Sequence, residues 1–149
     1  MAIRNIVKNG DDVLRKVCRS QLTFDDRLAQ LLDDMAETMY KADGCGLAAS
    51  QIGILRRVCI IDVGEGIIEL INPVIIDQSG VQYEEEGCLS FPGEFGKTKR
   101  PMHVTVRAMN RRGETVDYTG SGLLAKAFCH EIDHLDGKLY IDIAKMIDN

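Results

Sequence analysis

The segment from residue 57 to about 107 constrains the fold of this chain more than any other part of the sequence. It contains short runs that are rich in β-branched residues and broken by Gly, Pro, Asn and Asp, as strands are: RVCIIDV (57–63), IIELINP (67–73), VIIDQSG (74–80) and MHVTVRAM (102–109). No helical pattern separates these runs, and parallel strands need such crossovers. Residues 110–113 then predict a hairpin turn into a strand at Glu114–Tyr118. We therefore expect an α+β fold with mainly antiparallel β-sheets.

Two helices are predicted to flank these strands. The long N-terminal helix is expected to begin near Phe24 with Thr23 as its cap, and to stop at the Asp-Gly pair at 43–44. Its apolar residues recur at helical spacing; they are Leu28, Leu31, Leu32, Met35, Met39 and Ala42. The second helix follows Gly-Ser-Gly at 120–122, with Ser121 as a candidate cap. With no repeat or linker in 149 residues, we expect a single domain whose sheets pack around this C-terminal helix.

The composition narrows the classes of function. The net charge is −5, so the chain lacks the basic footprint of a protein that binds nucleic acid or an anionic membrane. No apolar run approaches the length of a membrane span, and the N-terminus lacks the apolar core of a secretory signal. The five cysteines are scattered and odd in number, which favours reduced thiols over a disulfide framework. We therefore expect a cytoplasmic protein with no membrane or nucleic-acid partner.

The motif HEIDH at 130–134 places two histidines four residues apart on the second helix. Such residues lie on one helix face, so His130 and His134 can direct two imidazoles at one metal ion. In the H-E-x-x-H pattern, Glu131 lies beside the ion and can take a proton from a bound water. Leu123 and Ala127 continue the same face, which predicts an apolar pocket next to the site. The alternative is an ordinary helix with a coincidental match.

A catalytic metal usually takes three protein ligands and leaves one position open, so a third ligand is needed. Cys88 in EEEGCLSFPG is the best candidate, because a thiolate and two imidazoles would leave that position free. The alternative interpretation of Cys88 is a small buried residue. His103 lies in a strand-like run and is expected to pack or to face solvent. In the Gly-rich segment GCGLAASQIG, Gln51 can donate a hydrogen bond to an oxyanion.

Three segments together resemble the motifs of the peptide deformylase family. GCGLAASQ at 44–51, EGCLS at 86–90 and HEIDH at 130–134 match the family's GxGLAAxQ, EGCLS and HExxH, in that order. The resemblance covers nearly the whole chain. It implies a single catalytic domain spanning residues 1–149. It also implies a metal-dependent hydrolase that removes the N-formyl group from the N-terminal formyl-methionine of newly made polypeptides, releasing formate.

The resemblance also implies roles for individual residues. By similarity, the metal ligands are Cys88, His130 and His134, and Glu131 is the general acid and base. The other implied roles are oxyanion stabilisation by Gln51 and the backbone N–H of Leu89, backbone contact with substrate by Gly46, and the methionine pocket at Leu123 and Ala127. The implied metal is Fe(II) in cells, although Zn, Ni and Co also suit the ligands. The implied partners are nascent formyl-Met peptides and, transiently, the ribosome, with the protein acting as a monomer.

Three positions depart from the family pattern. Cys129 stands where Gln is common, Ser50 stands where Pro is frequent, and Lys126 stands where an apolar residue would suit the pocket. Two other functions compete with the resemblance. An ordinary H-E-x-x-H peptidase would not explain EGCLS or Gln51. A structural metal clip, or a binding protein on a deformylase fold, would have no need of Glu131 or Gln51.

Overall fold

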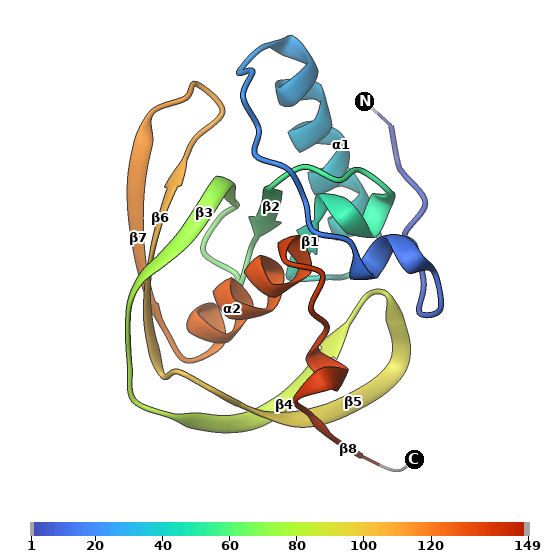
Figure 1. The fold of residues 1–149 in the computed structure, drawn as a ribbon, viewed down its shortest axis with the longest axis vertical. Coiled ribbons are helices and arrows are strands. Elements are labelled where there is room, and N and C mark those ends of the chain that lie inside the picture. Colours follow the sequence, from blue (N-terminus) through green and yellow to red (C-terminus); the bar gives the residue numbers. More distant parts are fainter. Residues whose placement is uncertain (1, 148–149) are drawn as a thin grey trace.

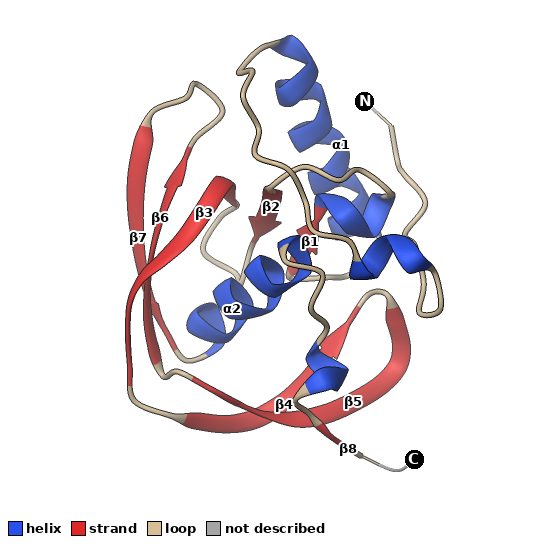
Figure 2. Ribbon diagram, in the orientation of Figure 1, coloured by secondary structure: helices blue, strands red, loops and turns tan. Residues whose placement is uncertain are grey.

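Two antiparallel sheets and two α-helices make up the computed structural model, which describes residues 2–147 (Figures 1 and 2). The larger sheet has the strand order β1-β2-β3-β6-β7, and the smaller sheet has the order β4-β5-β8. The strands are β1 (Gly46–Ala48), β2 (Val58–Ile61), β3 (Ile68–Ser79), β4 (Gln82–Cys88), β5 (Phe91–Arg100), β6 (His103–Met109), β7 (Thr115–Ser121) and β8 (Lys145–Met146). The α+β prediction is confirmed; residues 1 and 148–149 of the expected domain lie outside the described range.

The two α-helices cover opposite faces of the larger sheet. Helix α1 (Asp26–Lys41) packs on the face that carries Val58 and Ile60, whereas helix α2 (Leu123–Leu135) packs on the face that carries Cys59 and Ile61. Since both faces are covered, all four residues of β2 are buried, which explains its uninterrupted apolar sequence. Helix α2 thereby lies between the two sheets, at the centre of the molecule (Figure 2).

The long strand β3 corrects one prediction. IIELINP and VIIDQSG were expected to be separate strands, but β3 runs through Pro73 without a break. Register shifts between Ile71 and Val74 and between Ile75 and Asp77 accommodate the proline within a continuous strand. The hairpin between β6 and β7 is as predicted, with Asn110 accepting hydrogen bonds at the turn. Strands β4 and β5 were not predicted, because their sequences are polar and charged.

Both predicted helix caps are wrong. Asp25 caps α1, since its Oδ1 accepts a hydrogen bond from Leu28 N at 3.1 Å, and Thr23 lies two residues too early. Ser121 is the last residue of β7 and is hydrogen-bonded to His103 Nδ1, while α2 begins after Gly122, whose φ is +61°. A side chain at that φ would be strained, which explains the glycine there. Four of the six residues in the predicted apolar stripe of α1 are buried, whereas Leu31 is half-buried and Ala42, the C-cap, is exposed. Neither α-helix within residues 2–147 could span a membrane.

The cap of α1 can be tested by substitution. We expect Asp25→Ala to lower the free energy of unfolding by about 1 kcal/mol, because the N–H of Leu28 loses its partner. Thr23 is exposed, so Thr23→Ala should change the free energy of unfolding by less than about 0.5 kcal/mol. Urea unfolding of the two variants beside the wild type measures both values. Equal losses in the two variants would contradict the assignment of the cap.

Candidate active site

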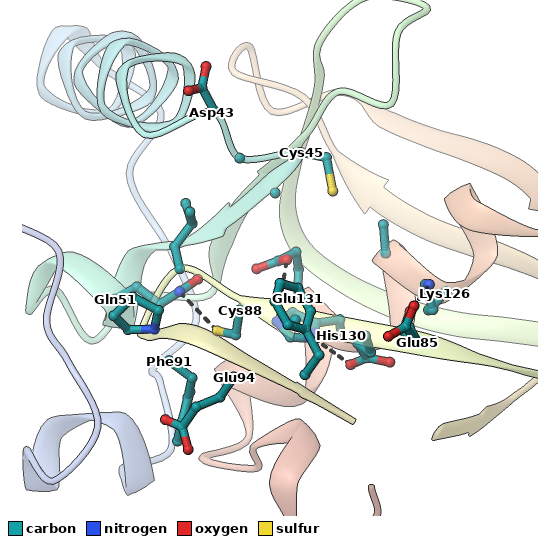
Figure 3. A pocket seen from close by; sticks show the side chains of 18 of the residues that line it. Asp43, Cys45, Gln51, Glu85, Cys88, Phe91, Glu94, Lys126, His130 and Glu131 are labelled. Carbon is teal, nitrogen blue, oxygen red and sulfur yellow. Dashed lines mark hydrogen bonds and ion pairs between the residues drawn. The ribbon is translucent and has the colours of Figure 1, made fainter. Parts of the chain in front are cut away.

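A thiol and two imidazoles converge where the end of β4 meets α2, and Figure 3 shows Cys88 and His130 of this group. The ligand atoms of Cys88, His130 and His134 all lie within 4.8 Å of one another. Cys88 Sγ is 3.3 Å from His134 Nε2, and the two histidine Nε2 atoms are 3.2 Å apart. The three residues that the sequence analysis grouped therefore do form one cluster. His103 lies elsewhere and is exposed.

The spacing of these donor atoms fits a transition-metal ion. Ligand atoms held about 2.0–2.3 Å from one tetrahedral ion lie roughly 3.3–3.6 Å from each other, close to the Cys88–His134 and His130–His134 separations. A thiolate with two imidazoles suits a divalent metal such as zinc or iron. Cys88, His130 and His134 could therefore hold such an ion with one position left over for a small ligand.

A buried carboxylate that the sequence analysis missed orients the first histidine. His130 Nδ1 lies 2.5 Å from Glu86 Oε2, and a carboxylate can only accept, so Nδ1 carries the proton and Nε2 faces the cluster. Arg100 donates to both oxygens of Glu86 and also to Asp133 on α2. Burial would raise the pKa of Glu86, but the hydrogen bonds from His130 and Arg100 hold it well below its usual range. Three consecutive glutamates gave no sign that only the last one is buried.

Glu131 lies beside the cluster and is almost fully buried. Its Oε2 is 3.9 Å from His130 Nε2, and its Oε1 has no hydrogen-bond partner among residues 2–147. Burial raises the pKa of Glu131 to about 7, so the side chain can both take up and give up a proton near neutral pH. Gly46 lies against this carboxylate, and a Cβ there would collide with it. The glycine is thus required by the close approach of Glu131.

Figure 3 shows Gln51 on the other side of Cys88 from Glu131. It belongs to the short helix η2 (Ala49–Ile52), where its Oε1 accepts a hydrogen bond from Ala48 N at 2.9 Å. Its Nε2 donates to Ser90 Oγ at 3.1 Å and lies 3.5 Å from Cys88 Sγ. The amide is therefore fixed at its acceptor end, with its N–H donors toward the cluster. Leu89 follows Cys88 at the turn between β4 and β5.

The cluster opens into a cavity of about 420 Å³. Ala127 forms part of its buried wall, whereas Leu123 is 51% exposed and lies at its mouth. Lys126 lines the cavity too, and its Nζ donates to the carbonyl oxygen of Glu85. Cys129 does not line the cavity; it is buried in the core, where burial raises the pKa of its thiol to about 11.

The ion pair behind His130 should matter for stability. Arg100→Met leaves Glu86 buried without a cation, so we expect the free energy of unfolding to fall by about 3–5 kcal/mol. Arg107→Met is the matched control, because it breaks an exposed pair with Asp117 and should cost less than about 1 kcal/mol. Urea unfolding at neutral pH measures both. A loss for Arg100→Met as small as that of the control would contradict the role of the buried pair.

Comparisons with known proteins identify the family. The family model described as polypeptide deformylase matches residues 3–149. The peptide deformylase of Acetivibrio thermocellus is 56% identical over 99% of this chain and 88% of its own length, and that of Alkaliphilus metalliredigens is 58% identical over 95% and 97%.

Among solved structures, the peptide deformylase of Thermotoga maritima has a TM-score of 0.94 at 42% identity, covering 96% of this chain and 98% of that one. The peptide deformylase of Ehrlichia chaffeensis in complex with actinonin has a TM-score of 0.95 at 34% identity, covering 97% and 90%. The chain therefore belongs to the polypeptide deformylase family, metal-dependent hydrolases, and its reaction is the removal of the N-formyl group from nascent peptides.

Proposed function

We propose that the chain acts as one catalytic domain, residues 1–149, on the N-terminal formyl-methionine of newly made polypeptides and releases formate. The observation that carries this proposal is the convergence of Cys88, His130 and His134 with the buried carboxylate of Glu131 at the end of an apolar cavity. A metal clip would need neither the carboxylate nor the cavity. The same convergence at the cavity also accounts for the EGCLS and GCGLAASQ segments, which an ordinary H-E-x-x-H peptidase leaves unexplained.

Cys88, His130 and His134 are the proposed metal ligands. A divalent ion held by them supplies a Lewis acid for the formyl group and makes a water acidic enough to ionise near neutral pH. We propose Fe(II) as the ion in cells, with Zn, Ni and Co also compatible with two imidazoles and a thiolate. Glu86 supports this set, because its hydrogen bond to His130 Nδ1 keeps Nε2 free to bind.

Glu131 is the proposed carrier of the proton. The attacking water must lose a proton and the departing amine nitrogen must gain one. A carboxylate whose pKa is raised to about 7 by burial can do both in turn. Its Oε1 is buried and has no hydrogen-bond partner among the described residues, so that oxygen is not committed to another contact. Glu131 then returns to its starting state when the amine leaves.

The remaining proposed roles concern charge and position. Negative charge builds on the formyl oxygen in the transition state, and Gln51 Nε2 and the N–H of Leu89 are the proposed donors to it. One such donor is typically worth about 3–4 kcal/mol. The backbone of Gly46 is proposed to align the peptide, and Ala127 and Leu123 to contact the methionine side chain.

The cellular setting is also part of the proposal. A substrate that carries its formyl group at the start of a new chain is met during translation. We therefore propose that the protein acts in the cytoplasm as a monomer, with transient contact with the ribosome.

Formate release from a short formyl-Met peptide tests the proposed function. The protein should be prepared anaerobically with Fe(II), its metal content measured, and the acetylated peptide run beside the formylated one. We expect one metal ion per chain and formate release, without cleavage of the acetylated peptide. Stoichiometric metal without formate release would instead support a binding protein on this fold.

Replacing Glu131 separates proton transfer from metal binding. We expect Glu131→Ala to lower kcat by a factor of about 10²–10⁴ or more, because proton transfer loses its carrier. The metal content should stay at that of the wild type, since Glu131 is not a proposed ligand. Glu65→Ala, in an exposed loop, is the control and should keep full activity. Loss of metal from Glu131→Ala, or retention of its activity, would overturn the assigned role.

A further inference from the structure

One residue of the cavity carries a charge that the proposed reaction does not use. Lys126 is half-buried on α2, and its Nζ donates to the carbonyl oxygen of Glu85 on β4. Within residues 2–147, no carboxylate lies within ion-pair distance of this ammonium. Figure 3 shows Lys126 next to Glu85 on the other side of His130 and Glu131 from Gln51. The cavity therefore has an ammonium at one end.

Lys126 lies along α2 at the level that the far end of the substrate's unbranched methionine side chain would reach. Lys126 lies four residues before His130, which is about 6 Å along the helix axis. An extended methionine side chain is of similar length. If the formyl group lies at the cluster, as the proposed function requires, the sulfur and methyl of the first residue come to the level of Lys126. The lysine stem can pack against them while the ammonium lies beside the sulfur.

The ammonium has hydrogen-bond donors beyond the one that links α2 to β4. It has three N–H donors and no acceptor, and the carbonyl of Glu85 takes one of them. A thioether is only a weak acceptor for the other two. Methionine sulfoxide, the oxidised form of methionine, places a strong acceptor oxygen on the same sulfur. A charged carboxylate side chain would be disfavoured, because Asp43, Glu85, Glu94 and Glu131 also line the cavity.

We propose that Lys126 allows this site to deformylate peptides whose formyl-methionine has been oxidised to the sulfoxide, as well as unoxidised ones. The ammonium donates to the sulfoxide oxygen a hydrogen bond that the apolar side chains of Leu123 and Ala127 in the same cavity cannot provide. No oxidant or reductant is needed, since only the formyl amide is hydrolysed and the sulfoxide leaves unchanged on the product. This inference rests on the proposed function and defines its substrate class more finely.

The test compares kcat/KM for one short formyl-Met peptide and its sulfoxide, with the two sulfoxide epimers separated. The metal-loaded enzymes are the wild type, Lys126→Met, Lys126→Arg and Lys99→Met. The readout is the ratio of sulfoxide to thioether kcat/KM within each enzyme, so that a general loss of activity cancels. Lys99 is exposed on β5 outside the cavity, which makes Lys99→Met the matched control. Thermal unfolding of each variant checks that it is folded.

For the better epimer, we expect the wild-type ratio to lie within about 10-fold of unity. Lys126→Met should lower that ratio by about 10-fold or more, because a hydrogen bond from a charged donor is worth about this factor. Lys126→Arg, which keeps N–H donors at the position, and Lys99→Met should both keep the wild-type ratio. A formyl-norleucine peptide, which has the same shape but no sulfur, should follow the thioether in all four enzymes.

Two results would overturn the inference. One is a wild-type ratio below about one in a hundred for both epimers, as expected if an oxidised side chain is simply excluded. The other is an equal loss of kcat/KM on both substrates in Lys126→Met. That result would mean that the lysine only links α2 to β4. Failure of the wild type on the unoxidised peptide would instead refute the proposed function, so the two failures are distinguishable.

Discussion

The buried carboxylate of Glu86 joins the central helix to the smaller sheet, and the geometry of the site depends on this contact. Its two oxygens accept hydrogen bonds from His130, Arg100 and Thr98. Arg100 then reaches Asp133, one turn beyond His130 on the same helix. Two buried charges of this kind are costly to desolvate, and only a full set of partners compensates for that cost. The same partners hold β4, β5 and α2 in one arrangement.

The periodicities of strand β4 and helix α2 then bring the residues of the site together. Residues two apart on a strand point to the same side, so Glu86 and Cys88 both face α2. Residues four apart on a helix do likewise, and the two repeats have similar lengths, roughly 6.5 Å for the strand and 6 Å for the helix. Glu86 therefore meets His130 while Cys88 meets His134. Gly87, between them, lies so close to the ring of Phe95 that any side chain there would collide with it.

Local patterns in the sequence predicted much of this molecule. The apolar stripe of α1, the histidine face of α2, the hairpin at 110–113 and the antiparallel class were all visible as periodicity or turn chemistry. The two caps were misplaced because several residues near each helix start can cap, and only the backbone path selects one of them. Strands β4 and β5 were missed because their pairing, not their composition, makes them strands: GEFGKTKR carries almost no β-branched residue.

The sequence by itself determined which residue types could do the chemistry, because HEIDH, EGCLS and GCGLAASQ specify donors at fixed local spacing. It also determined that α2 must be central, because apolar residues and the two histidines occupy neighbouring stripes of that helix. Only the tertiary structure decided that Glu86, and neither Glu84 nor Glu85, is buried behind His130, and that Arg100 neutralises it. It likewise decided that Lys126 ends at the carbonyl of Glu85 within the cavity. Those contacts join residues far apart in the chain, and no local periodicity records which distant partner a buried charge will meet.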